Sequence, residues 1–129
     1  MPSIRHLAIK CTDPFAMAQF YAGTFDMHEV AHTDRTVYMS DGVINLALLP
    51  LHDGEKPGID HFGFLVEDME EMRKRLAVAE VPEPTTRPAD GRYAEFRTAD
   101  PEGNGIDLGV NGWYTEAGQG LASTESAPA

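Results

Sequence analysis

The feature that most constrains the fold is a pattern that occurs twice. The hexapeptide IRHLAI, which contains His6, is matched 55 positions later by IDHFGF, which contains His61, and Asp13 and Asp68 each follow the histidine of their copy by seven positions. A repeat of this length is typical of a fold built from two copies of one supersecondary unit. Each copy is therefore expected to form the same elements in the same order.

Each copy begins with a strand and continues with a helix. Leu7 and Ile9 alternate with polar or small residues, as strand residues with one buried face do. Asp13 and Asp68 are good N-cap residues, so a helix is expected to follow each of them. Further strands are predicted at residues 27–32, 35–40 and 43–50 of the first copy and at 92–98 and 105–110 of the second, with the proline-rich residues 82–90 forming a loop or an edge segment.

These elements predict an α+β fold made of two βαβββ modules, residues 3–50 and 59–110. Eight strands with one helix per module fit two curved sheets that form an open, barrel-like cup with the helices outside. At 129 residues the chain is expected to fold as one domain, residues 1–116. The small and polar residues 117–129 are expected to form a flexible C-terminal tail.

Charge and composition exclude several kinds of partner. The formal net charge of −11 argues against a nucleic-acid or anionic-membrane surface, which needs clustered lysine and arginine. No apolar run approaches the roughly 18 residues that a spanning helix needs. The N-terminus lacks the apolar stretch of a secretory signal, and a single cysteine, Cys11, permits no intrachain disulfide. A soluble cytoplasmic protein is expected.

Strand alternation places several polar side chains in the cup. Neighbouring residues of a strand face opposite sides, so His6 and His61 point away from the apolar residues that pack under the helices. Asp107 lies between two apolar residues of the last strand, and Asn45 is its counterpart in the first copy. Two imidazoles and one carboxylate suit a divalent metal ion such as Zn²⁺, Mn²⁺ or Fe²⁺. The alternative is that both histidines are interior residues satisfied by hydrogen bonds.

Other polar residues are expected near the same cup. Tyr93, Glu95 and Arg97 share one face of their predicted strand. Tyr93 and Glu95, together with Asn45, are predicted to contact substrate. Glu95 is either a general base or a solvated surface residue. Trp113 follows the last strand and either closes the mouth of the cup or packs at its rim. No residue is assigned a catalytic role.

The chain resembles the vicinal oxygen chelate superfamily. The resemblance covers residues 4 to about 110 and is carried by the two histidine motifs, by the pair Asp13-Pro14 and by the segment DPEGNGIDL at 100–108. That group includes glyoxalase I, methylmalonyl-CoA epimerase, extradiol dioxygenases and the fosfomycin and bleomycin resistance proteins. The resemblance implies ligand positions at His6, Asn45, His61 and Asp107. This chain departs twice, with Asn45 in place of glutamate or glutamine and Asp107 in place of glutamate.

A three-ligand site of two histidines and one carboxylate looks most like the extradiol dioxygenases. The resemblance therefore implies a non-haem Fe(II) dioxygenase-like enzyme acting on a small catechol- or enediol-like substrate with vicinal oxygens. Fe²⁺ is favoured, with Mn²⁺, Zn²⁺ or Ni²⁺ as alternatives. A glyoxalase-like lyase or isomerase and a non-catalytic, drug-sequestering protein remain as alternative functions. A small-molecule substrate and a homodimer are the expected partners.

Overall fold

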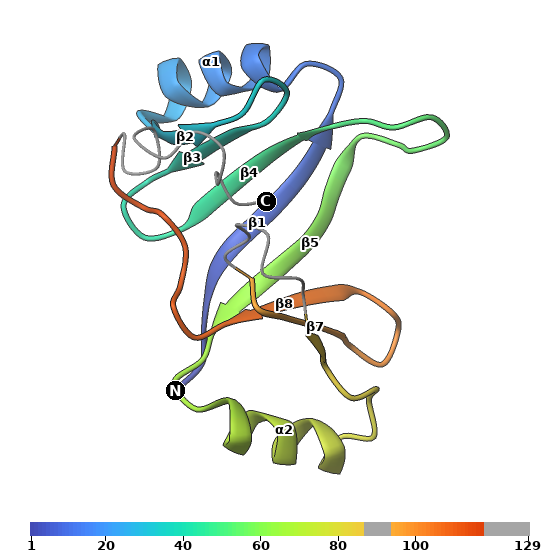
Figure 1. Ribbon diagram of the computed structural model, residues 1–129. Helices are drawn as coiled ribbons and strands as arrows, with labels where there is room; N and C mark the ends of the chain where they lie inside the picture. The colour runs from blue at the N-terminus through green and yellow to red at the C-terminus, as the bar shows by residue number, and fades with distance from the viewer. Residues whose placement is uncertain (87–93, 118–129) are drawn as a thin grey trace.

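The computed structural model describes residues 1–86 and 94–117 (Figure 1). The predictions made for Tyr93 and for the tail beyond residue 117 lie outside these residues. No helix in the described ranges is long and apolar enough to span a membrane.

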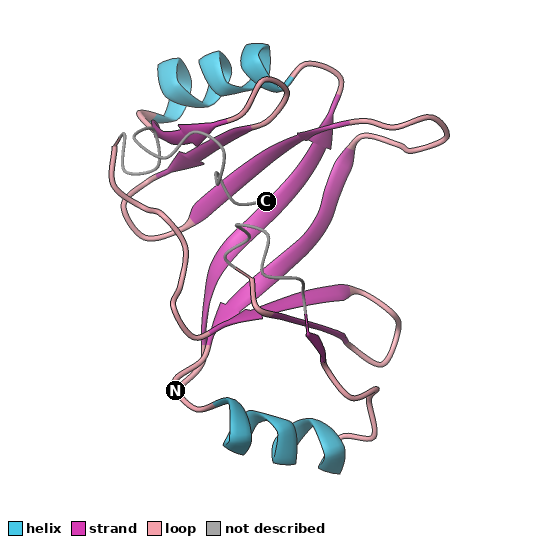
Figure 2. Cartoon of the chain, in the orientation of Figure 1, coloured by secondary structure: helices cyan, strands magenta, loops and turns pink. Residues whose placement is uncertain are grey.

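Within the described residues, eight strands and two helices follow one another as the repeat predicts. The strands lie in one open sheet in the order β2-β3-β4-β1-β5-β8-β7-β6, and the helices lie at opposite ends of the molecule (Figure 2). Their bounds are β1 Ser3–Cys11, α1 Pro14–Phe25, β2 His28–His32, β3 Val37–Ser40, β4 Asn45–Pro50, β5 Gly58–Leu65, α2 Met69–Val78, β6 Thr85–Thr86, β7 Phe96–Ala99 and β8 Gly105–Gly109. The predicted α+β cup of two βαβββ modules is confirmed.

The two modules join through their first strands. In each module the first strand pairs in parallel with the last, β1 with β4 and β5 with β8. β1 and β5 then pair antiparallel with each other, so that the two modules share one continuous sheet. The two curved sheets expected to meet around the cup are thus joined into one, because the first strand of each module has a free edge that the other module's first strand fills.

Local signals explain where the helices begin. The Asp13 carboxylate accepts hydrogen bonds from the backbone N–H groups of Phe15 and Ala16, and Asp68 caps α2 in the same way. Leu7 and Ile9 of β1 pack against the core cluster beneath α1, as the alternation predicts. His6, which immediately precedes Leu7, faces the opposite, concave side of the sheet.

The two halves are packed unequally. Both described clusters of buried apolar side chains belong to the first module, whereas α2 has no buried residue. A cavity of about 250 Å³ lies between α2 and the sheet, lined by Phe64, Met72, Leu76 and Leu108 among others. α2 is thus held less firmly than α1.

The second module departs from prediction at β7. Among the residues that the structure describes, the strand expected at 92–98 begins at Phe96, and the carboxylate of Glu95 accepts hydrogen bonds from backbone N–H groups that follow β8. Thr85–Thr86, in the segment predicted to be a loop or an edge, form the short edge strand β6 against β7, in agreement with that prediction. β8 still pairs with β7, with Asp107 opposite Arg97.

Candidate metal centre

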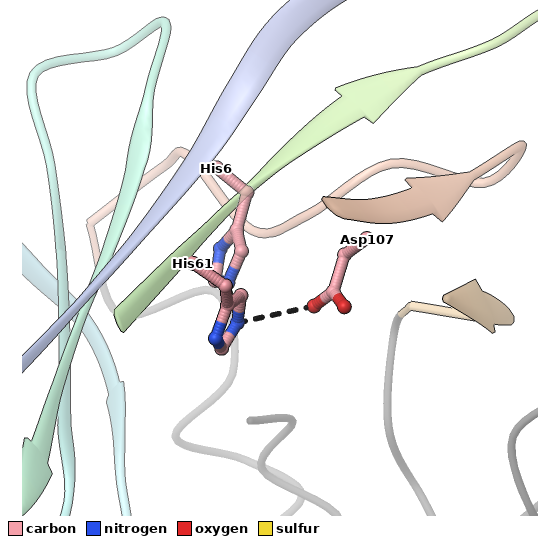
Figure 3. Close-up of side chains that lie close together, drawn as sticks. All are labelled: His6, His61 and Asp107. Atoms are coloured by element: carbon pink, nitrogen blue, oxygen red, sulfur yellow. Dashed lines mark hydrogen bonds and ion pairs between the residues drawn. The ribbon is translucent and has the colours of Figure 1, made fainter. Parts of the chain in front are cut away.

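Three predicted ligands come together at the middle of the sheet. His6 lies on β1, His61 on β5 and Asp107 on β8, and their side chains converge on the concave side (Figure 3). His6 and Asp107 are fully buried, and His61 is 7% exposed. Gly63 of β5 is the register partner of both His6 and Asp107. Because a glycine stands between them, the side chains from the two flanking strands approach one another and His61 without obstruction.

The spacing of the ligand atoms fits one small cation. Nε2 of His6 lies 3.3 Å from Nε2 of His61, which lies 3.2 Å from Oδ2 of Asp107. One atom from each residue falls within 4.8 Å of the others. Ligands held about 2.0–2.2 Å from one ion, at angles of roughly 90–110°, are about 2.8–3.6 Å apart. The two spacings to His61 therefore match edges of a coordination polyhedron, and the spacing between His6 and Asp107 is at most 4.8 Å.

Asn45 orients His6. Its Nδ2 donates to the carbonyl oxygen of Tyr114 at 2.8 Å, so Oδ1 is the atom that faces His6 and accepts from its Nδ1 at 2.9 Å. Nδ1 of His6 thus carries the proton, and Nε2 keeps its lone pair. Both polar atoms of the Asn45 side chain are engaged away from the ligand atoms. Its expected contact with substrate stays a prediction.

Asp60 orients His61 in the same manner. Its Oδ2 accepts from Nδ1 of His61 at 2.9 Å, which leaves Nε2 of a neutral His61 ring as an electron-pair donor. Lone pairs of His6, His61 and Asp107 therefore face one another across short distances. Such an arrangement is repulsive unless a proton or a cation lies among them, and a histidine whose outer nitrogen is bound to a carboxylate or carbonyl is typical of metal ligands.

Arg97 fixes the carboxylate. Its Nε donates to Oδ1 of Asp107 at 2.7 Å from the register-paired position on β7, leaving Oδ2 directed at the imidazoles. Burial by itself raises the pKa of Asp107, but the neighbouring His61 and the hydrogen bond from Arg97 outweigh it and lower that pKa to about 2. Sequence reasoning placed Arg97 on the cup face and missed this pair. The signal was present, since residues 97 and 107 are equidistant from the turn at 100–104.

His6 is neutral at physiological pH. Burial, followed by the nearby His61, lowers its pKa from 6.5 to about 4. A neutral imidazole and an ionised carboxylate are the protonation states that metal ligation requires.

The predicted role of Glu95 is not tested by its geometry, but its position is clear. The carboxylate accepts from the backbone N–H of Val110 at 2.9 Å and from Nδ2 of Asn111 at 2.8 Å. It thereby fastens the chain that leaves β8 beside the cup. Trp113 in that same chain lies on the ring of His6. No periodic pattern surrounds Trp113, so the sequence did not distinguish a residue that closes the mouth of the cup from one that packs at its rim.

Comparisons with known proteins identify a family and similar folds. The family model described as Glyoxalase/Bleomycin resistance protein/Dioxygenase superfamily matches residues 3–108. No significant match is found among curated protein sequences.

Three solved structures have similar folds. A hypothetical protein from Bacillus halodurans C-125 has a TM-score of 0.64 at 18% identity, over 84% of this chain and 93% of that one. Methylmalonyl-CoA epimerase from Mycobacterium tuberculosis has a TM-score of 0.62 at 20% identity, over 82% and 85%. The 2,3-dioxygenase LapB from Pseudomonas sp. KL28 has a TM-score of 0.70 at 22% identity, over 98% of this chain but 46% of that one. At these identities the likeness is one of fold.

Proposed function

Because the chain belongs to the glyoxalase/bleomycin resistance protein/dioxygenase superfamily, we propose that it is a metal-dependent enzyme in which His6, His61 and Asp107 hold one divalent ion. The observation that carries the proposal is the convergence of these three ligand atoms within 4.8 Å in a buried site. Asp60, Asn45 and Arg97 would act around them as orienting partners, each hydrogen-bonded to one ligand.

The ligand count favours oxygen chemistry. Asn45, at the position where a fourth ligand is expected, is turned to the outer nitrogen of His6. A two-histidine, one-carboxylate set leaves up to three positions of an octahedral ion open, which suits a bidentate substrate together with O₂. When bound, the ion would act as a Lewis acid toward two vicinal substrate oxygens. We therefore favour Fe²⁺ and a catechol- or enediol-like substrate.

The protein's own residues would supply orientation and charge. Asn45 and Asp60 hold the two rings with Nε2 turned inward. Arg97 keeps Asp107 ionised and binds its Oδ1, so Oδ2 would be the oxygen that holds the ion. Burial of His6 and Asp107 limits the access of water, which strengthens each of these interactions.

The test is reconstitution with Fe²⁺ under anaerobic conditions, followed by an oxygen-electrode screen of catechols and enediols. The expected result is oxygen uptake that is lost in His61→Ala and retained in His52→Ala, a histidine in the exposed link between the modules. Isomerase or lyase activity with Mn²⁺, Ni²⁺ or Zn²⁺ and no oxygen uptake would replace the dioxygenase proposal by the glyoxalase-like alternative. Ligand binding that is equal in His61→Ala and wild type, without turnover, would favour the sequestering alternative.

The oligomeric state is a separate proposal. All three ligands come from one chain, so the centre needs no second subunit. The homodimer stays a prediction, and light scattering coupled to size-exclusion chromatography would decide it. Location in the cytoplasm likewise stays a prediction, which fractionation of the source cells would test.

A further inference from the structure

The segment that follows β8 crosses from the second module to the first. Residues 110–117 leave the lower end of the sheet and run back to the strands near α1 (Figure 1). The carbonyl oxygen of Tyr114 accepts from Asn45 at 2.8 Å, and that of Thr115 lies 2.8 Å from Nε2 of His28. Glu95 holds the beginning of the segment through Val110. Trp113 is therefore fixed from both sides.

The indole of Trp113 lies flat on the imidazole of His6. The ring centroids are 5.0 Å apart and the planes differ by 4°. Trp113 is the single tryptophan of the chain, and the residue is only 9% exposed to solvent. Offset stacking of this kind favours one ring orientation over others.

Two glycines make room for the indole. A Cβ atom added to Gly63 would lie 3.0 Å from two carbons of the Trp113 ring and 3.2 Å from Cβ of Asp107. A Cβ atom added to Gly109 would lie 3.2 Å from the same ring. The floor under the indole is thus formed by backbone from β5 and β8, the two strands that carry His61 and Asp107.

The indole is not held there by a hydrogen bond of its own. Nε1 of Trp113 is buried, and no acceptor for it lies within the part of the chain that the structure describes. A buried N–H without a partner costs free energy. The contacts that hold the ring are therefore those with His6 and with the backbone of Gly63 and Gly109.

We propose that Trp113 is a positioning residue of the metal centre: the indole, packed on the face of the His6 ring, and Asn45, bonded to its Nδ1, together hold Nε2 toward His61 and Asp107. Asn45 sets which nitrogen of His6 carries the proton, and the indole sets the tilt of the ring. Neither contact alone fixes both the tautomer and the tilt of the His6 ring. This inference rests on the proposed metal site for its consequence, but the orientation of His6 can be measured without metal.

The experiment compares Trp113→Phe, which keeps an aromatic face, with Trp113→Leu, which keeps apolar bulk only. The first readout is the orientation of the His6 ring in chelator-treated protein, from nuclear Overhauser contacts of its two carbon-bound ring protons with neighbouring side chains. The second is the affinity for Co²⁺ and its visible absorption spectrum, which reports coordination geometry. Leu48→Ala is the matched control, because Leu48 is fully buried in the core beneath α1 and its loss destabilises the fold at a distance from the site.

The expected result is that Trp113→Leu changes the ring contacts of His6, weakens Co²⁺ binding about tenfold and alters its spectrum, whereas Trp113→Phe and Leu48→Ala do not. A Trp113→Leu protein with the wild-type ring contacts and spectrum would overturn the proposal, as would equal changes in Leu48→Ala. If wild-type protein binds no Co²⁺, the proposed function fails, and the comparison of the His6 ring contacts alone then decides the role of Trp113.

Discussion

Lowering the pH in the presence of a chelator should weaken the folded state chiefly through His6. Its imidazole is fully buried, and burial together with the neighbouring His61 lowers its pKa from 6.5 to about 4. In the unfolded chain the same ring takes up a proton as the pH falls through 6.5, whereas in the folded protein it does so only near pH 4. The unfolded state therefore gains stability from proton binding throughout this window.

The size of the effect follows from the shift. One pKa unit corresponds to about 1.4 kcal/mol, so His6 should lower the free energy of unfolding by about 2 kcal/mol at pH 5 and about 3 kcal/mol by pH 4, relative to neutral pH. Asp107 acts in a lower window. Its pKa is lowered to about 2, so the stability that it contributes is present above its ordinary value of 3.8 and is lost as the pH falls through 2.

The assay is urea denaturation at half-unit steps from pH 7.5 to 4.5, with chelator throughout. The control is His6→Asn, which offers an N–H near the position of Nδ1 and does not titrate. Its free energy of unfolding should fall less steeply with decreasing pH than that of wild type, whatever its stability at neutral pH. Parallel pH profiles for the two proteins would refute the reasoning, because His6 would then not be the titrating group.

Three further predictions concern the surroundings of the site. Asn45→Ala should lower the free energy of unfolding by about 1–3 kcal/mol, measured by denaturation, and weaken metal binding roughly tenfold, measured by competition with a chromogenic chelator. Unchanged affinity would show that the imidazole needs no orienting acceptor. Gly63→Ala should destabilise the fold by about 1–3 kcal/mol through its 3.0 Å clash with the indole, whereas Gly105→Ala, whose Cβ would meet its nearest neighbour at 3.5 Å, should not; equal melting temperatures would contradict this. Arg97→Gln should raise the pKa of the buried Asp107 carboxylate, so that the protein loses stability at a higher pH during acid unfolding. Arg73→Gln, which breaks a surface ion pair of the same 2.7 Å length, should leave acid unfolding unchanged. Identical acid-unfolding curves for wild type and the Arg97 variant would contradict a stabilising Arg97–Asp107 pair.

Much of the site was predictable because it depends on alternation. Whether a strand residue faces the helix or the cup follows from its immediate neighbours, so His6, His61, Asn45 and Asp107 were all placed on the concave side. The repeat then supplied what a single strand does not, namely that the two histidines occupy equivalent positions in two joined modules. The helix starts were equally predictable, because each is set by one capping aspartate in the local sequence.

The remainder depends on contacts between distant segments. The register of β1 against β5 shifts on either side of His6, and no residue in either strand predicts such irregularities. The hydrogen bond between Asn45 and Tyr114 joins residues 69 positions apart, in a segment without periodicity. In the sequence Gly63 is only a small strand residue, and its need to be glycine becomes evident from the Trp113 indole that packs against it. These features follow from tertiary packing, which a pattern of neighbours does not encode.

The three ligands are widely separated along the chain, and this has a consequence for folding thermodynamics. His6 and His61 are 55 positions apart, and Asp107 lies a further 46 positions beyond. Gathering them in a disordered chain would require closing a loop of about 100 residues, whose entropy cost is of order 4–5 kcal/mol. The unfolded chain therefore has little affinity for the ion, and nearly all of the binding energy is coupled to folding. Each tenfold rise in free metal above the dissociation constant should add about 1.4 kcal/mol to the free energy of unfolding. A bound ion would act as a reversible cross-link that forms only when both halves of the sheet have assembled.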